Sequence, residues 1–211
     1  MAENTDLWQI ERDLTEQGIG IICGCDEAGA GPLAGPVYAA AVILPPYCQI
    51  EGLNDSKKLT EKKREALYEV ITQKAVCWAV ARMEAAEIDA TDILSARMKA
   101  MQQAMDALTV QPEIALIDGN RDKGRSAAIT TPHKLVVGGD GKSASIAAAS
   151  ILAKVSRDRF VAGELDERYP QYQFAKHKGY GTKLHYEMLD KFGPCPEHRR
   201  SFLKKWEEKR I

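Results

Sequence analysis

Short apolar runs and helical repeats alternate along the first 140 residues of the chain. The runs have the length of buried strands and lie at residues 20–25, 37–44, 75–83, 113–117 and 134–137. Apolar residues recur at helical spacing near residues 7–14, 60–74 and 91–108. Thr60 can cap the second of these helices, and the Met and Leu stripe of the third is typical of core packing. Strands mixed with helices in this way predict an α/β sheet.

The last third of the chain has a helical pattern. An Ala- and Ser-rich segment at residues 143–167 favours a helix whose small side chains allow close packing against a sheet, and Pro170 marks its end. Two shorter helices are predicted at residues 182–192 and 198–209. We therefore expect an N-terminal helical segment (1–19), a central α/β domain (20–168) and a helical C-terminal extension (169–211).

Composition excludes several classes of protein. No apolar run approaches the ~20 residues of a transmembrane helix, and the N-terminus does not resemble a secretion signal, so we expect a cytoplasmic protein without membrane association. The five cysteines are irregularly spaced and form no CxxC pair, which disfavours a zinc or redox site. Cys23 and Cys25 share one face of the first strand and are interpreted as buried core residues.

Charge is unevenly distributed although the net charge is only −1. From Gly141 onward the chain has 15 Lys and Arg against 9 Asp and Glu, and three of its four histidines. This basic part is a plausible surface for phosphates, and a solvated helical face is an equally good interpretation.

Three of the predicted strands end in acidic residues. Asp26 and Glu27 follow the first strand, Asp118 follows a later one and Asp140 follows the last. Ligand sites of α/β sheets gather at strand ends, although an aspartate there can also be only a turn residue or a helix cap. Adjacent strand residues point to opposite faces, so we expect a bend at the glycine-rich loop after Glu27 to bring both acids to one site.

Clustered carboxylates repel each other and raise one another's pKa values unless cations are bound. Hard oxygen ligands suit Mg²⁺ or Mn²⁺, whereas zinc sites are rich in His and Cys. Two such ions ~3.5–4 Å apart can activate a water and stabilise the leaving oxygen of a phosphodiester. The pattern therefore favours Mg²⁺ or Mn²⁺ held by the four acids.

Several blocks of the sequence resemble the motifs of bacterial ribonuclease HII, a type 2 RNase H family. They are DEAGAGPLAGPV at residues 26–37, NDSKKL at 54–59, DGN at 118–120, GD at 139–140, SIAAASILAKV at 145–155 with RD at 157–158, HKGYGT at 177–182 and HRRSF at 198–202. The blocks occur in the family's order and cover about residues 20–203.

The resemblance implies an RNase H-like mixed sheet flanked by helices, with a helical C-terminal extension that contributes to substrate binding. It also implies an enzyme that hydrolyses the RNA strand of RNA/DNA hybrids and cuts 5′ of ribonucleotides embedded in duplex DNA, leaving 3′-hydroxyl and 5′-phosphate ends. We expect the protein to be a monomer. The four catalytic, metal-binding acids of the family match Asp26, Glu27, Asp118 and Asp140. The substrate-binding positions match Gly29, Ala30, Gly31, Lys57, Lys58, Asn120 and Tyr180.

One position departs from the family pattern. The family has Arg, or sometimes Lys, between the two glycines that read the ribose, and this chain has Ala30. Recognition by the loop backbone can survive, but a cation is lost, and one charged hydrogen bond contributes about 1.5–3 kcal/mol. We hypothesise either a variant with altered substrate preference or a substitution that weakens turnover, and we expect metal binding to persist in both cases.

Two other interpretations stay open. The chain can be a catalytically impaired module that binds RNA/DNA, which Ala30 favours, or a DNA-directed nuclease on the same scaffold, which the glycine loop and Tyr180 disfavour. A dinucleotide-binding enzyme has little support, because residues 28–31 (AGAG) do not form a GxGxxG motif.

Overall fold

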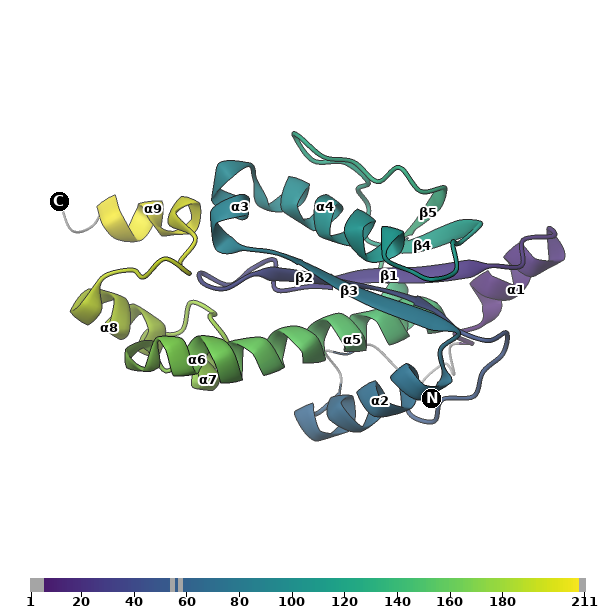
Figure 1. Cartoon of the computed structure of the whole chain (residues 1–211), viewed down its shortest axis with the longest axis horizontal. Helices are drawn as coiled ribbons and strands as arrows, with labels where there is room; N and C mark the ends of the chain where they lie inside the picture. The colour runs from purple at the N-terminus through teal and green to yellow at the C-terminus, as the bar shows by residue number, and fades with distance from the viewer. Residues whose placement is uncertain (1–5, 54–55, 57–58, 209–211) are drawn as a thin grey trace, which may run out of the picture.

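A five-stranded mixed sheet forms the centre of the structure, a computed structural model that describes residues 6–53, 56 and 59–208. The strand order is β3-β2-β1-β4-β5. The strands are β1 (Ile22–Ala28), β2 (Val37–Ile43), β3 (Cys77–Met83), β4 (Ile114–Asp118) and β5 (His133–Val136). The first three strands pair antiparallel, and β4 and β5 continue from β1 in parallel. The predicted α/β sheet is confirmed (Figure 1).

Strand β1 is longer at its end than the sequence pattern predicts. Asp26, Glu27 and Ala28 lie within it, because they pair with residues 40, 39 and 38 of β2. The predicted strand end before Asp26 is therefore wrong, because Asp26 and Glu27 are residues of the strand itself. The small alanines of β2 allow the ladder to continue past the local turn signal.

One face of the sheet is covered by α3 (Ala85–Ala90) and α4 (Ile93–Asp106) (Figure 1). The Met stripe of α4 is buried as predicted, with Met98, Met101 and Met105 at most 1% exposed. It packs in one apolar cluster with the buried Cys23 and Cys25. Both cysteines are thus core residues.

The other face is covered by α5 (Ala144–Phe160) and α2 (Glu61–Lys74) (Figure 1). Thr60 caps α2 as predicted, because its side chain accepts a hydrogen bond from the Lys63 amide. Helix α5 approaches β1 so closely that a side chain at Gly24 would collide with the backbone of Ser145. The small residues of this helix thus bring its surface directly against the strand that carries Asp26.

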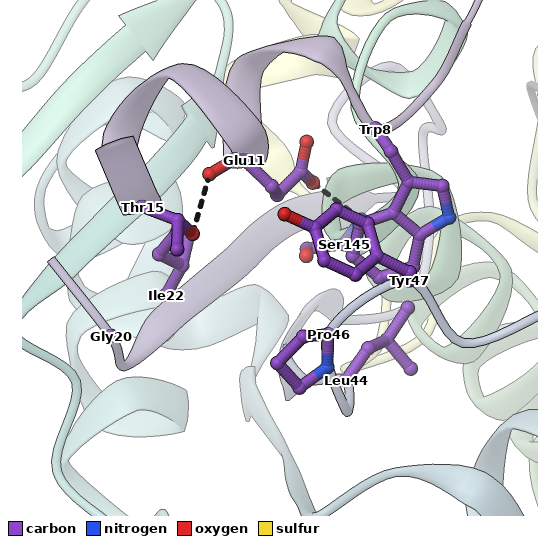
Figure 2. Close-up of a pocket in the computed structure, with 9 residues that line it drawn as sticks. All are labelled: Trp8, Glu11, Thr15, Gly20, Ile22, Leu44, Pro46, Tyr47 and Ser145. Carbon is purple, nitrogen blue, oxygen red and sulfur yellow. Dashed lines mark hydrogen bonds between the residues drawn. The ribbon is translucent and has the colours of Figure 1, made fainter. Parts of the chain in front are cut away.

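Helix α1 (Gln9–Glu16) is fastened to the start of α5 (Figure 2). The Glu11 carboxylate accepts hydrogen bonds from the Ser143 hydroxyl at 2.6 Å and the Ser145 amide at 3.1 Å. A negative charge at a helix N-terminus is favourable because free amides point toward it. The N-terminal helix therefore fixes one end of α5.

Past α5, the chain forms the helical extension at the far end of the sheet from α1 (Figure 1). Its elements are a π-helical turn (Val161–Leu165), α6 (Asp166–Arg168), a 3-10 turn (Pro170–Tyr172), α7 (Phe174–His177), α8 (Lys183–Phe192) and α9 (Arg200–Glu208). The predicted helix over residues 143–167 is thus continuous, and its hydrogen bonding changes from α to π at Val161 and back to α at Asp166. Over the described ranges, no helix has both the length and the hydropathy to cross a membrane.

Candidate active site

A cavity of about 210 Å³ opens beside the C-terminal ends of β1 and β4. Three of the predicted acids, Asp26, Glu27 and Asp118, line it. Gly29 and Ala30 of the loop after β1 line it as well, and Tyr180 reaches it from the helical extension. Residues separated by more than 150 positions in the sequence therefore share one cavity.

The parallel pairing of β1 with β4 brings Asp26 close to Asp118. The β1–β4 ladder ends at the pair Cys25 and Ile117, and each aspartate directly follows its member of that pair. Paired residues of parallel strands share a face. The Asp118 carboxylate also accepts a hydrogen bond of 2.6 Å from the Gly139 amide, which ties β4 to the 3-10 turn Gly139–Gly141 that carries Asp140.

Negative charge is concentrated around Asp26. Burial raises the pKa of the Asp26 carboxyl well above its usual value, and the neighbouring charges of Glu27, Asp118 and Asp140 raise it further. Asp140 is itself buried, with 5% of its surface exposed, although it does not line the cavity. The four predicted acids thus act on one another.

Glu27 and Asp26 leave β1 on opposite faces, as normal strand alternation requires. Asp26 shares the face of its partner Ala40, toward α5, whereas Glu27 forms an ion pair of 2.6 Å with Arg97 of α4. The other Glu27 oxygen, Oε2, is buried and has no hydrogen-bond partner. Both acids line the cavity despite their opposite directions.

The donor chemistry of this cluster fits a divalent cation. The predicted ligands are all carboxylates, and the unpartnered Glu27 Oε2 is a buried oxygen that a cation would satisfy. Among the described residues, no three acidic, His or Cys side chains stand together at the spacing of a metal centre. Asp26, Glu27, Asp118 and Asp140 thus stay predicted metal ligands, and the first, second and third of them line the same cavity.

At Gly29, in the loop after β1, the backbone conformation allows only glycine. Its φ of 90° is left-handed, and a side chain there would collide with that of Arg157. Arg199 of the extension donates hydrogen bonds to the carbonyls of Gly29 at 2.7 Å and Ala30 at 3.0 Å. Gly31 is exposed and does not line the cavity.

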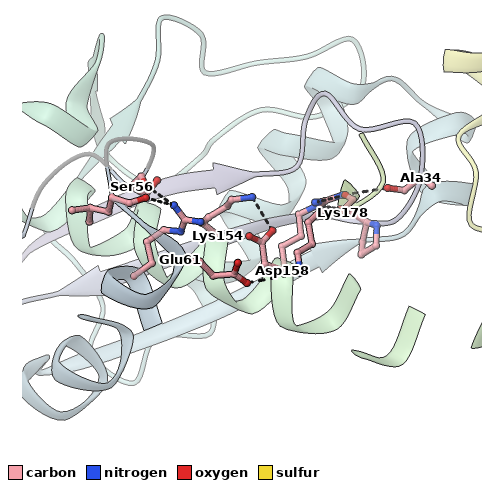
Figure 3. A network of polar contacts seen from close by, with 10 residues as sticks. Ala34, Ser56, Glu61, Lys154, Asp158 and Lys178 are labelled. Atoms are coloured by element: carbon pink, nitrogen blue, oxygen red, sulfur yellow. Dashed lines mark hydrogen bonds and ion pairs between the residues drawn. The ribbon is translucent and has the colours of Figure 1, made fainter. Parts of the chain in front are cut away.

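A second buried arginine, Arg157 of α5, also binds backbone. It donates to the carbonyls of Pro36 at 3.0 Å, Ala34 at 3.2 Å and Lys178 at 3.0 Å, and Figure 3 shows Ala34 and Lys178 in this network. Arg157 and Arg199 are both fully buried. These two cations of the basic C-terminal part therefore stabilise loops, and the expectation that this part as a whole forms a phosphate-binding surface is corrected for them.

Tyr180 is the exposed aromatic residue of the cavity, with 41% of its surface accessible. The preceding Gly179 has a φ of 81°, and a side chain there would collide with the Ala34 carbonyl. The ammonium of Lys154 lies 5.7 Å from the Tyr180 ring and 2.8 Å from the Asp158 carboxylate. Tyr180 is thus presented by a tight turn next to the acids.

The remaining predicted site residues lie elsewhere. Asn120 is exposed and does not line the cavity, and Lys57 and Lys58 lie outside the described residues. Ser56 does line it, and Arg64 of α2 donates to the carbonyl of Ser56 at 3.0 Å (Figure 3). Sequence reasoning missed Arg97, Arg157, Arg199 and Lys154. The last three lie within the recognised blocks, and nothing in the sequence pattern points to Arg97.

The architecture is that of the RNase H-like class of folds. The solved structure of ribonuclease H2 from Pyrococcus horikoshii superimposes with a TM-score of 0.72 at 25% identity, covering 90% of this chain and 98% of that one. An RNase HII from Archaeoglobus fulgidus, solved in complex with PCNA, has a TM-score of 0.69 at 26% identity and covers 86% of this chain and 94% of its own. Bst-RNase HIII, solved with Mn²⁺, shares the fold at 19% identity and a TM-score of 0.60.

Sequence comparison assigns the family. The ribonuclease HII family model matches residues 23–207. The ribonuclease HII of Idiomarina loihiensis is 58% identical over 182 residues, covering 86% of this chain and 95% of the relative. That of Caldicellulosiruptor bescii is 48% identical over 204 residues, covering 97% of each. The chain therefore belongs to the ribonuclease HII family and is a hydrolase that acts on the RNA of RNA–DNA hybrids.

Proposed function

We propose that this chain also cuts duplex DNA 5′ of embedded ribonucleotides, leaving 3′-hydroxyl and 5′-phosphate ends. The observation that carries this proposal is the shared cavity, in which the acids of β1 and β4 lie beside the glycine loop and Tyr180. Phosphodiester chemistry and a sugar-contacting surface are thereby adjacent. The family assignment supports the same reaction.

Asp26, Glu27, Asp118 and Asp140 would hold Mg²⁺ or Mn²⁺ as the catalytic residues. Bound divalent ions supply an activated water and stabilise the leaving 3′-oxygen. The chain's own contribution is to hold the carboxylates at the ends of β1 and β4 and on the turn after β5, and to keep Asp26 away from bulk water. The mutual repulsion of these acids would be relieved when cations bind.

The ribose would be read by the loop backbone at residues 29–31 and by the Tyr180 ring. The 2′-hydroxyl distinguishes RNA from DNA, and backbone without large side chains allows a close approach to it. Arg199 holds the carbonyls of Gly29 and Ala30, which makes the loop rigid before substrate arrives. Lys57, Lys58 and Asn120 would contact the nucleic-acid backbone.

Ala30 supports a second candidate function, a module that binds RNA/DNA with little cleavage. The Ala30 side chain brings no charge to the cavity, so a phosphate near it would lack the cation that the family pattern provides. On either proposal the chain acts as a monomer in the cytoplasm. Analytical ultracentrifugation at increasing protein concentration tests the oligomeric state.

The deciding experiment uses an end-labelled DNA duplex with one ribonucleotide and an all-DNA duplex of the same sequence. We expect cleavage of the first duplex alone, with Mg²⁺ or Mn²⁺ and not with EDTA, and a mapped 3′-hydroxyl on the 5′ side of the ribonucleotide. Asp118→Asn should reduce the rate at least about a hundredfold, whereas Asp106→Asn, at an exposed carboxylate of α4, should not change it. Binding without cutting would establish the module instead, and cleavage of both duplexes would establish a DNA-directed nuclease.

A further inference from the structure

Arg97 is a charged residue on an otherwise apolar stretch of α4. Its neighbours Ala96 and Met98 are 1% exposed and belong to the core. The Arg97 guanidinium reaches across to Glu27 of β1, with 2.6 Å between Nη2 and Oε1. The side chains are only 25% and 13% exposed, so solvent screens this ion pair weakly.

The hydrogen bonding of this pair is incomplete. Oε2 of Glu27 and Nε of Arg97 are both buried without a hydrogen-bond partner. A bidentate pairing would place a guanidinium nitrogen on each carboxylate oxygen. In this structure Arg97 contacts only Oε1 of Glu27. Arg97 therefore neutralises Glu27 and leaves one buried carboxylate oxygen free to accept another cation.

Lys154, a cation that lines the cavity, is already engaged. The ammonium of Lys154 lies 2.8 Å from Asp158, which balances its charge. Asp26 and Asp118, in contrast, are two further carboxyl groups that line the same cavity as Glu27. Arg97 thus brings positive charge directly to one of the acids that would ligate a metal.

We propose that Arg97 competes with a divalent cation for Glu27 and so sets the metal affinity of the site. This inference rests on the proposed metal-binding role of the acids. Arg97 is a positioning residue: while it stays on Oε1, Glu27 can offer only Oε2, and full use of the carboxylate requires the guanidinium to leave. Its charge also repels an arriving cation, because the guanidinium lies 2.6 Å from the carboxylate that the cation would bind.

The test measures Mn²⁺ binding by isothermal titration calorimetry without nucleic acid. Arg97→Gln, and Arg97→Met as a second neutral variant, should bind Mn²⁺ about tenfold more tightly than the unchanged chain. Arg97→Lys keeps the charge and should stay within about threefold of the unchanged chain. Lys99→Gln removes the same charge two residues further along α4 at a side chain that is 53% exposed, and should change nothing.

Two outcomes overturn the proposal. Unchanged Mn²⁺ affinity in the neutral variants means that Arg97 does not compete for Glu27. Weaker Mn²⁺ binding means that Arg97 supports Glu27 as a ligand. Circular dichroism checks that each variant is folded. Asp118→Asn, titrated in parallel, separates this failure from a failure of the proposed function. If Asp118→Asn weakens Mn²⁺ binding and Arg97→Gln does not strengthen it, only the role of Arg97 is wrong. If Asp118→Asn binds Mn²⁺ unchanged, the metal site itself is wrong.

Discussion

At the scale of single residues, the backbone conformation of the glycine loop does not depend on the side chain at position 30. The Ala30 carbonyl is held by Arg199, and Gly29 takes its left-handed conformation against Arg157, so neither contact involves the side chain at position 30. The loop therefore keeps its backbone whichever side chain stands there. A cation can be restored at this position without rebuilding the loop.

Ala30→Arg should raise kcat/KM on a duplex with one embedded ribonucleotide by about ten- to a hundredfold, the equivalent of one charged hydrogen bond. Steady-state cleavage at fixed Mg²⁺ and salt concentrations measures this change. Ala107→Arg, which adds the same charge at the exposed end of α4, is the control and should leave kcat/KM within about twofold. Equal rates for Ala30→Arg and the unchanged chain would show that position 30 contributes no charge to catalysis.

The sequence identifies acids more readily than it identifies buried cations. Their positions at or near strand ends predict Asp26, Glu27, Asp118 and Asp140 as a set. The structure gathers all of them except Asp140 at one cavity. Arg157 and Arg199 looked like ordinary members of a basic region. Their burial depends on carbonyls more than 100 residues away in the sequence, a relation that no local pattern contains.

At the scale of elements, sequence pattern predicts existence better than boundaries. Helices α2 and α4 begin within two residues of the predicted positions, because Thr60 and Asp92 cap them locally. Helix α3 was missed, being only six residues long, although Glu84 and Glu87 form a capping box that could have revealed it. The end of β1 was misplaced because pairing with β2 overrides the local signal.

Arg199 joins two elements, the glycine loop and the start of α9, through carbonyl contacts to Gly29, Ala30 and Gly35. Arg199→Met leaves these carbonyls without their charged donor and should lower the free energy of unfolding by about 3 kcal/mol or more, and cleavage with it. The adjacent Arg200→Met, at a side chain that is 57% exposed, should change stability by less than about 1 kcal/mol. Urea unfolding of the two variants provides the comparison, and equal losses would contradict this role of Arg199.

Three buried histidines hold the turn that presents Tyr180. Gly179 donates to His177, the Cys195 amide donates to His198 Nδ1, and His198 and His185 share a contact of 3.0 Å between their Nε2 atoms. His185 Nδ1 then donates to the Tyr180 carbonyl at 3.0 Å. Each ring thus has one accepting and one donating nitrogen, which assigns all three as neutral.

This cluster makes stability depend on pH. Burial lowers the pKa of His185 to about 4 and of His198 to about 3, so the folded state favours neutral rings. The stabilisation is complete above the unfolded value near 6.5 and is lost as pH falls below it, by about 1–2 kcal/mol per ring at pH 5. Urea unfolding at pH 7.5, 6 and 5 should show this decline, and His198→Gln should flatten it.

At the scale of the whole molecule, the helical extension is part of the same structural unit as the sheet. Asp89 of α3 accepts hydrogen bonds from the backbone of residues 200 and 201, and Glu61 of α2 lies 3.9 Å from Lys178. Arg157 and Arg199 add buried contacts between these parts. The division at residue 168 stays a prediction, and these contacts cross it.

We therefore expect the extension and the sheet to unfold together. In a Trp8→Phe/Trp78→Phe variant, fluorescence reports on Trp206 of α9 alone, and far-UV circular dichroism reports on the whole chain. Both signals should give the same urea midpoint within error. An earlier fluorescence transition would show that the extension unfolds as a separate domain.

The long reach of Arg199 has a consequence for protein synthesis. The ribosome makes the loop at residues 29–31 early and adds the side chain that fixes its carbonyls about 170 residues later. Until that arginine has left the exit tunnel, the nascent chain carries its acids next to an unfastened loop. We therefore expect a nascent chain that lacks Arg199 to lack the fastened loop of the complete protein.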